Sequence, residues 1–346
     1  MGTAAFIHAA GDIRIGPFSP EQAGSNSVMV RVASVGVCGS DLHYYKDGGI
    51  GSAVIDKPFV PGHEFSATLI ADVEQANLQR NQIVAIDPAL PCHNCEWCAR
   101  GYHNLCPHVV FLGAPPYNGA LTQEIAVPLK SIIPLPDSMT ADQGAMLEPL
   151  GVCIHAVDLA KPRLLETVAV VGCGAIGLGI IQLLKLTGCG QVYAIDPQPH
   201  RYRAAQKYGS ETFAVAGGDS IDLISDETQG RGCDLVIEAT NSADGLAHAI
   251  KATRIGGRAV LVGIPDGDLY SPVSAAEARR RGLSLKFSRR MGNVYPRAID
   301  LVAANRVNVD SLVSHRFSLE DTAQAFSMQA SSTEGLLKSL IYPNGE

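Results

Sequence analysis

TVAVVGCGAIGLGIIQLLKLTGCGQVYAID, residues 167–196, decides the fold of this chain. The stretch begins with the apolar run Val168–Val171 and continues through the glycine pattern G-x-G-x-x-G. An apolar segment with helical spacing, Ala175–Leu186, follows, and then a second strand pattern, Gln191–Ile195. Strand, glycine turn, helix and strand in this order predict a βαβ unit that binds a dinucleotide, with the pyrophosphate at the helix N-terminus.

The three glycines of the turn and an acidic residue carry the cofactor prediction. Gly172 permits the tight turn, Gly174 lets the backbone approach a pyrophosphate, and Gly177 lets helix and strand pack closely. Asp196 ends the next strand, nineteen residues beyond Gly177. A carboxylate there accepts hydrogen bonds from ribose hydroxyls and repels a 2′-phosphate, which favours NAD over NADP.

One arginine leaves the choice of cofactor open to a second interpretation. Arg201 lies one helical turn beyond Asp196, where it can either serve a 2′-phosphate or flank the adenine. The predicted cofactor-binding residues are Gly172, Gly174, Ala175, Ile176, Gly177, Asp196, Arg201, Gly263 and Ile264.

The alternation of strands and helices continues after this stretch. Helical patterns at His200–Tyr208 and Ala243–Thr253 alternate with strand patterns at Cys233–Ala239 and Arg258–Gly263. Such alternation predicts a doubly wound parallel sheet, so we expect an α/β domain of the Rossmann type over residues 151–288.

The sequence before this domain has a different character. In residues 1–150 the segment Val28–Val35 has strand alternation, and short apolar stretches recur at Ala67–Ala71 and Gln82–Ile86. Frequent prolines favour loops and edge strands here. We therefore expect a β-rich first domain.

After about residue 288 the pattern is mixed. One helix is expected to begin at Tyr295–Pro296, with proline in its first turn. A second is expected to begin after Ser318, with Ser318 as its cap and Asp321 reaching back.

Composition excludes several classes of protein. The formal net charge of −7 argues against nucleic acid and anionic membrane surfaces as partners, and the one tight basic cluster, Arg279–Arg281, is expected to be a solvated helix end. No apolar run reaches the roughly eighteen residues of a membrane span, and no secretory signal opens the sequence. We expect a cytoplasmic protein, in which the nine cysteines need an explanation other than disulfides.

Four of these cysteines form the pattern C-x2-C-x2-C-x7-C at Cys92, Cys95, Cys98 and Cys106. Four thiolates at this spacing can surround one zinc ion in a closed, structural site. An iron–sulfur cluster is the competing interpretation, because Pro107 follows the last cysteine as in ferredoxins. Zinc is favoured because the last gap is seven residues rather than three and no second cluster motif exists.

A second metal set is suggested by residue type but by no short spacing. Cys38, His63, Glu64 and Glu148 offer the sulfur, nitrogen and oxygen ligands that a catalytic zinc uses, with one coordination position left open. Taken singly, each residue has an ordinary structural interpretation.

The arrangement of these motifs resembles the zinc-containing medium-chain alcohol dehydrogenases, in particular their sorbitol and polyol dehydrogenase branch. The similar segments, in order over almost the whole chain, are CGSDLHYY at 38–45, PGHE at 61–64, the four-cysteine loop, EPL at 148–150, Arg290, and NVYP at 293–296. The resemblance implies a GroES-like β-barrel catalytic domain, residues 1–150 completed by 289–346, around the inserted Rossmann domain.

The resemblance also implies roles for individual residues. Cys38, His63 and Glu64 would bind the catalytic zinc, and Glu148 would bind it either directly or through its water. A cysteine replaces Glu148 in the simple-alcohol enzymes, so this glutamate points to the polyol branch, and Cys153 is a less favoured ligand.

The same likeness implies a proton relay and a substrate pocket. Ser40 would contact the reacting oxygen and His43 would pass the proton outward, although His43 could also be an ordinary surface histidine. Tyr44 and Arg290 correspond to positions that contact the polyol. The chain departs from the sorbitol enzymes at Met291 and at the segment Phe111–Pro116, which leaves the substrate open.

The implied function is therefore hydride transfer from a secondary alcohol of a sorbitol-, xylitol- or iditol-like polyol to NAD, giving a ketose, with two zinc ions in each chain. Oxidation of L-idonate, a 2,3-diol or threonine is the alternative within the family. A zinc-free enone reductase and a non-catalytic zinc-binding module are the alternatives outside this branch. The family implies a homodimer or homotetramer.

Overall fold

The computed structural model describes residues 2–24, 26–213 and 220–345. The chain divides into two compact units. Unit 1 comprises Met1–Pro149 and Gly292–Glu346, and unit 2 comprises Leu150–Met291. Unit 2 is thus an insertion in unit 1, and the boundaries expected from the sequence, after residues 150 and 288, lie close to these.

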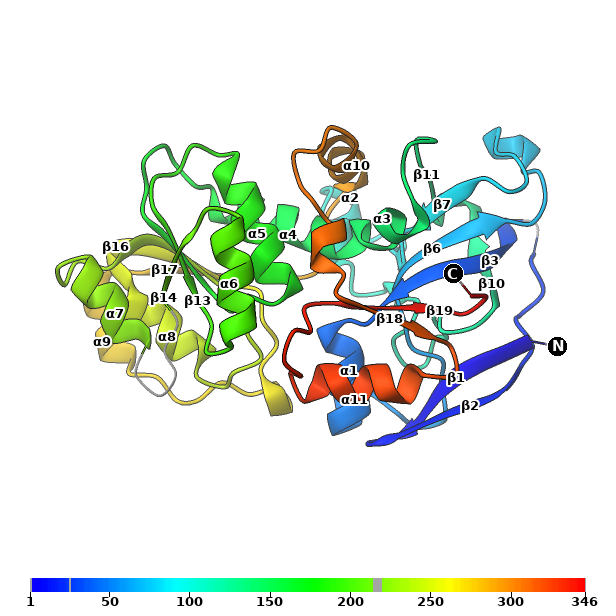
Figure 1. Cartoon of the computed structure of the whole chain (residues 1–346), viewed down its shortest axis with the longest axis horizontal. Helices are drawn as coiled ribbons and strands as arrows, with labels where there is room; N and C mark the ends of the chain where they lie inside the picture. The colour runs from blue at the N-terminus through cyan, green and yellow to red at the C-terminus, as the bar shows by residue number, and fades with distance from the viewer. Residues whose placement is uncertain (1, 25, 214–219, 346) are drawn as a thin grey trace. The chain divides into compact units, whose positions relative to one another are not determined.

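Unit 1 is built on a seven-stranded sheet. Its strands lie in the order β11 (Ile132–Pro134), β7 (Ile83–Ile86), β6 (Glu64–Leu69), β3 (Ser27–Gly36), β19 (Ser339–Tyr342) and β18 (His315–Ser318), with β10 (Glu124–Pro128) also paired to β3. Apolar side chains of β3, β6 and β7 form its core with Phe59 and Phe326. The strand β19, late in the sequence, pairs antiparallel with the early strand β3, as the red and blue ribbons of Figure 1 show. The C-terminal segment is therefore an integral part of the first sheet.

The elements of unit 1 are β1 (Gly2–Ala9), β2 (Asp12–Phe18), β3 (Ser27–Gly36), α1 (Gly39–Asp47), β4 (Gly49–Ile50), β5 (Ala53–Val54), β6 (Glu64–Leu69), β7 (Ile83–Ile86), β8 (Ala89–Leu90), α2 (Glu96–Ala99), β9 (Val110–Phe111), β10 (Glu124–Pro128), β11 (Ile132–Pro134), α3 (Ala141–Ala145), α10 (Tyr295–Ala303), β18 (His315–Ser318), α11 (Thr322–Ala330) and β19 (Ser339–Tyr342). The helix α4 (Leu147–Ala160) crosses from unit 1 into unit 2.

Unit 2 contains one six-stranded sheet in the order β14-β13-β12-β15-β16-β17, and every pairing in it is parallel. In order of occurrence this is 3-2-1-4-5-6, the order of dinucleotide-binding sheets. The predicted doubly wound parallel sheet is therefore confirmed. Its elements are β12 (Val168–Val171), α5 (Ala175–Lys185), β13 (Val192–Ile195), α6 (Pro199–Lys207), β14 (Glu211–Phe213), α7 (Ser220–Glu227), β15 (Cys233–Glu238), α8 (Gly245–Ala252), β16 (Thr253–Leu261), α9 (Ala275–Arg281) and β17 (Ser284–Phe287).

Two local predictions were wrong. The last predicted helix was expected to begin directly after Ser318, with Ser318 as its cap. It begins at Thr322 instead, because Ser318 is still paired with Tyr342 in the sheet. Its hydroxyl donates to Asp321 Oδ2 at 2.7 Å instead of capping the helix. Thr253, expected to end a helix, begins β16 because it pairs with Cys233.

Two other expectations concern the surface and the membrane. Arg279 and Arg280 are exposed in the last turn of α9, as predicted for a solvated helix end, whereas Arg281 is half-buried and donates to Ile250 O at 3.0 Å and Lys251 O at 3.2 Å. None of the helices in the described ranges is long and apolar enough to cross a membrane.

Candidate active site

Three predicted metal ligands come together in unit 1. Cys38 follows β3 and precedes α1, while His63 lies directly before β6, whose first residue is Glu64. Because β3 and β6 are antiparallel neighbours, with Gly36 opposite Glu64, these ends meet. One ligand atom from each of Cys38, His63 and Glu64 lies within 4.8 Å of the others, a spacing that one metal ion can bridge. We refer to these three residues as the Cys-His-Glu cluster.

A buried aspartate fixes the geometry of this cluster. Asp41, in the first turn of α1, accepts the Cys38 N–H at 3.0 Å and the Gly62 N–H at 3.3 Å. Its Oδ1 also lies 3.4 Å from His63 Nδ1. A carboxylate in this position orients a metal-binding histidine. Burial disfavours the charged ring, but Asp41 and Cys38 raise the pKa of His63 well above its ordinary value.

The second predicted glutamate lies beside the cluster without joining it. Glu148, in the first turn of α4, is buried and interacts electrostatically with His63 and Glu64. Burial first, and then the Glu64 carboxylate, raise the pKa of Glu148 to about 7. The 4.8 Å set contains Glu64 and not Glu148.

The predicted relay residues lie on α1. His43 is buried, so it is not an ordinary surface histidine, and its Nδ1 lies 3.0 Å from Oδ2 of the partly exposed Asp47. Ser40 is partly buried at the start of the same helix. Tyr44 is buried with its ring edge-on to Phe59, so the ring packs in the core of unit 1.

The four-cysteine loop forms a second cluster. Ligand atoms of Cys92, Cys95, Cys98 and Cys106 all lie within 4.8 Å of one another. Cys106 Sγ is 3.5 Å from Cys92 Sγ and 3.9 Å from Cys95 Sγ. Zn–S bonds of 2.3 Å in a tetrahedron give S···S distances of about 3.8 Å. Backbone N–H groups, that of Asn94 first, lower the pKa of Cys92 to about 6, which favours the thiolate.

The glycine turn of unit 2 has the geometry that a dinucleotide requires. Gly172 has a φ of +93°, which favours glycine. A Cβ on Gly177 would lie 1.8 Å from the Gly172 carbonyl oxygen, so only glycine fits there. A Cβ on Gly174 would meet nothing within 4 Å, so space remains in front of the N-terminus of α5, where Ala175 and Ile176 begin the helix.

The acidic residue at the end of β13 is held by the backbone. Asp196 accepts N–H groups of Cys173 and Gln198, both at 2.8 Å, and Arg201 lies 3.9 Å from its Oδ2. Arg201, the residue that could bind a 2′-phosphate, is thus the ion-pair partner of Asp196, the residue that would repel a 2′-phosphate. Just after β16, a Cβ on Gly263 would lie 1.8 Å from Thr240 O, so only glycine fits there, and the neighbouring Ile264 is exposed.

The remaining predicted residues belong to unit 2. Arg290, just beyond β17, has a left-handed backbone with a φ of 52°, and Met291 is buried. Cys153 donates to Ile176 O at 3.3 Å and lies against Gly179, so its thiol packs on α5.

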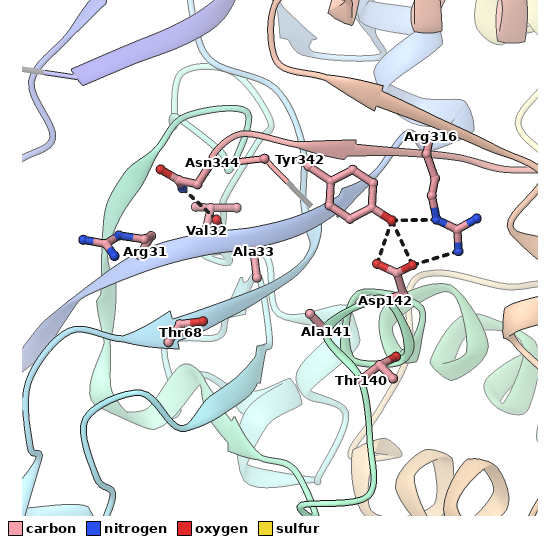
Figure 2. A pocket seen from close by; sticks show the side chains of 11 residues that line it. Arg31, Val32, Ala33, Thr68, Thr140, Ala141, Asp142, Arg316, Tyr342 and Asn344 are labelled. Carbon is pink, nitrogen blue, oxygen red and sulfur yellow. Dashed lines mark hydrogen bonds and ion pairs between the residues drawn. The ribbon is translucent and has the colours of Figure 1, made fainter.

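A separate pocket of about 400 Å³ lies in unit 1 (Figure 2). Arg316 and Tyr342 both donate to Asp142 in its lining. No predicted site residue lines it, so the predicted chemistry does not involve this pocket.

Two residues that contact the Cys-His-Glu cluster, Asp41 and Lys338, were not identified from the sequence. Asp41 stands inside the CGSD motif, three residues after Cys38, where its capping position was a usable signal. Lys338 forms a buried ion pair with Glu64 and donates to Val37 O at 2.9 Å. Its signal was a single lysine in an otherwise mostly apolar run ending at Tyr342.

Comparison with known proteins shows sequence similarity to two domain families and to several dehydrogenases. Residues 24–137 match the family described as alcohol dehydrogenase GroES-like domain, and residues 175–304 match zinc-binding dehydrogenase. The chain is 36% identical to human sorbitol dehydrogenase over 92% of this chain and 90% of that protein. It is 33% identical to sorbitol dehydrogenase of Bacillus subtilis strain 168 over 99% of this chain and 97% of that protein.

A solved structure extends the comparison. L-idonate 5-dehydrogenase from Escherichia coli superposes with a TM-score of 0.87, 25% identity, and coverage of 99% of this chain and 98% of that one. The predicted GroES-like and Rossmann-type domains are confirmed. The chain belongs to the zinc-containing medium-chain dehydrogenases, in the branch that includes the sorbitol dehydrogenases.

Proposed function

We propose that this chain oxidises a secondary hydroxyl of a polyol to a ketone, with zinc at the Cys-His-Glu cluster and NAD as hydride acceptor. The observation that carries the proposal is the convergence of a half-buried thiol with a buried imidazole and a buried carboxylate, whose ligand atoms lie within 4.8 Å of one another. A glycine turn shaped for a pyrophosphate, followed by Asp196, supplies the cofactor half of the reaction.

The donor set fits zinc, because sulfur, nitrogen and oxygen ligands with an open position are typical of catalytic zinc sites. We propose a second, structural zinc at the four cysteines, whose closed set leaves no open position. When bound, the catalytic zinc lowers the pKa of the substrate hydroxyl, and NAD accepts the hydride.

The proton of the substrate hydroxyl is transferred by residues of the chain itself. We propose that Ser40 binds the reacting hydroxyl and that His43 moves the proton outward. The His43–Asp47 contact at 3.0 Å supports this role, because it connects a buried ring with a partly exposed carboxylate.

Replacing His43 with Ala tests the relay. We expect the rate to fall about 100-fold near pH 7 and much less above pH 9, where hydroxide takes over the proton. The measurement is kcat against pH for both proteins. The same dependence of kcat on pH in both proteins would reject the relay. In an Asp47→Asn variant, we expect a smaller fall in kcat that is again larger near pH 7 than above pH 9.

A polyol is the substrate class we favour. The glutamate at position 148 supports it, as do the names of the two sorbitol dehydrogenase relatives. Tyr44 and Arg290 are proposed to bind further hydroxyls through their donor groups. Sugar acids are the second candidate, because the superposed L-idonate enzyme shares the whole fold.

The test is NAD reduction across sorbitol, xylitol, L-iditol, L-idonate, 2,3-butanediol and threonine, before and after chelation. We expect the highest kcat/KM with a polyol and loss of activity without zinc. Activity that survives complete removal of zinc would reject the mechanism, and a preference for threonine or 2,3-butanediol would reject the substrate class.

We further propose that the protein forms homodimers or homotetramers. β17 is the edge strand of its sheet, and its last residue, Phe287, is 62% exposed. Leu269 is 76% exposed and precedes Tyr270, whose ring lies 6.3 Å from that of Phe287. A second copy would cover such a surface. Light scattering of the purified protein, compared with Phe287→Glu, tests this proposal.

A cytoplasmic location is also proposed. All nine cysteines are free of disulfide bonds, and cysteines remain unoxidised in a reducing compartment. Localisation of a tagged protein by fractionation tests this point.

A further inference from the structure

A buried lysine is paired with a predicted metal ligand. The Lys338 side chain is 4% exposed, and its ammonium forms an ion pair with Oε2 of Glu64, which is 1% exposed. It also donates to Val37 O at 2.9 Å. Burying an ammonium group costs stability unless it is paired and hydrogen-bonded. Its position at the cluster therefore indicates a role in the site.

The surrounding backbone leaves space for this pair. Gly36 lies opposite Glu64 in the β3–β6 ladder, and a Cβ there would lie 2.2 Å from Glu64 Oε2 and 3.1 Å from Lys338 Cε. Any larger residue would displace the carboxylate. Gln329 of α11 adds a second donor to Val37 O, at 2.7 Å. Two donors from the C-terminal segment thus hold the carbonyl that precedes Cys38.

The Lys338–Glu64 ion pair lies among the charged groups of the cluster. Lys338 interacts electrostatically with Glu64, Cys38 and Asp41, and also with Glu148. An oxygen engaged by an ammonium group is less available to a metal cation. A carboxylate freed from its ammonium would have both oxygens available to the metal.

We propose that Lys338 is a positioning residue that holds Glu64 Oε2 and so keeps one coordination position of the zinc open for the substrate. This inference rests on the proposed function, since it concerns the same zinc. Lys338 and Asp41 then act in opposite directions. Asp41 supports the metal through His63, whereas Lys338 restrains a ligand and repels the cation.

The experiment measures zinc release to a chromogenic chelator from the full-length protein. In wild type we expect two phases, a faster one from the Cys-His-Glu cluster and a slower one from the four cysteines, which serves as an internal reference. Lys338→Met, uncharged and of similar length, should slow the faster phase about tenfold or more and lower kcat, while Asp41→Asn should accelerate the same phase about tenfold.

Matched variants separate charge from packing. Lys338→Arg retains the positive charge and should restore release and kcat close to wild type. Lys338→Gln retains a donor for Val37 O and should behave like Lys338→Met, which covers the case in which Met disturbs the fold. Lys57→Met removes an exposed lysine and should leave both phases unchanged.

The outcomes distinguish this proposal from the proposed function. A fast phase in Lys338→Met and Lys338→Gln that is equal to or faster than that of wild type overturns the positioning role, because the lysine would then only stabilise the fold. A wild-type protein that binds no zinc, or that reduces no NAD with any substrate, overturns the proposed function instead.

Discussion

Two buried carboxylates of unit 1, Glu64 and Glu148, interact with one ammonium group, that of Lys338. The ion pair satisfies Glu64, whereas burial and the Glu64 charge raise the pKa of Glu148 to about 7. In a protein without metal, Glu148 therefore binds a proton more tightly when folded than when unfolded. A bound cation would favour the carboxylate instead, so zinc binding should release protons.

The metal-free protein should lose stability as the pH rises from about 4.5 to about 7. The pKa of Glu148 is 4.5 in the unfolded chain and about 7 in the folded one, so the folded state binds more protons in this window. The loss due to Glu148 is on the order of 3 kcal/mol. Urea unfolding of chelated wild type and Glu148→Gln at pH 5 and pH 8 measures it. Parallel losses in both proteins would contradict the assignment.

The choice of cofactor depends on one carboxylate. Replacing Asp196 with Ser removes the charge that repels a 2′-phosphate, and with it the ion pair that Arg201 makes with Asp196 at 3.9 Å. We expect the ratio of kcat/KM for NAD over NADP to fall about 10–100-fold, since a charge-assisted contact is lost and a repulsion is relieved. Steady-state kinetics with both cofactors measure the ratio. Adding Arg201→Gln should reverse part of the gain with NADP, and an unchanged ratio would show that Asp196 does not select the cofactor.

At the scale of elements, the sequence predicts best where periodicity and local spacing coincide. The strand Val168–Val171 and the helix after the glycine turn were predicted within a residue or two, because the glycines and the apolar runs mark both ends. The β-strand at Val28–Val35 was found by its alternation. The start of the last helix was misplaced because strand pairing holds Ser318, and the pairing of β18 with β19 leaves no local signal in the sequence.

Helix α3 is tied to the C-terminal strands by one carboxylate. Asp142 accepts from Arg316 Nη2 at 3.0 Å and from the Tyr342 hydroxyl at 2.8 Å and 2.9 Å (Figure 2). Asp142→Ala should lower the free energy of unfolding by about 1–3 kcal/mol, because two donors lose a charged acceptor. Chemical denaturation measures the change. Glu124→Ala is the control, since its ion pair with Arg31 is exposed and 3.8 Å long, and we expect about 0–1 kcal/mol there. Equal effects in both variants would contradict the prediction.

At the scale of the whole molecule, the ligand residues were recognisable but their supports were not. Cys38, His63 and Glu64 stand in short motifs that resemble a family, so residue type and order pointed to them. Lys338 acts on Val37 across 301 residues of sequence. A contact of that range depends on the pairing of β3 with β19, which no local pattern in the sequence reveals.

The inserted unit should fold and bind NAD without the rest of the chain. It has a continuous sequence, a complete sheet and a core of its own, which includes Ala169, Tyr193 and Val236. A fragment of residues 147–291, which keeps α4 whole, should bind NAD within about tenfold of the full-length affinity. Calorimetry measures the binding, and the Asp196→Ser fragment should bind more weakly. An unfolded fragment by circular dichroism would contradict the prediction.

The interruption of unit 1 sets an order of events during synthesis of the protein. A ribosome that makes about 5–20 residues per second needs about 15–60 s to travel from Val37 to Lys338, which are 301 positions apart. Throughout that interval β3 lacks its β19 neighbour, and Glu64 lacks its counter-charge. The nucleotide-binding unit can fold on the nascent chain, whereas the catalytic centre must wait until Lys338 has been synthesised before it is complete and can be loaded with metal.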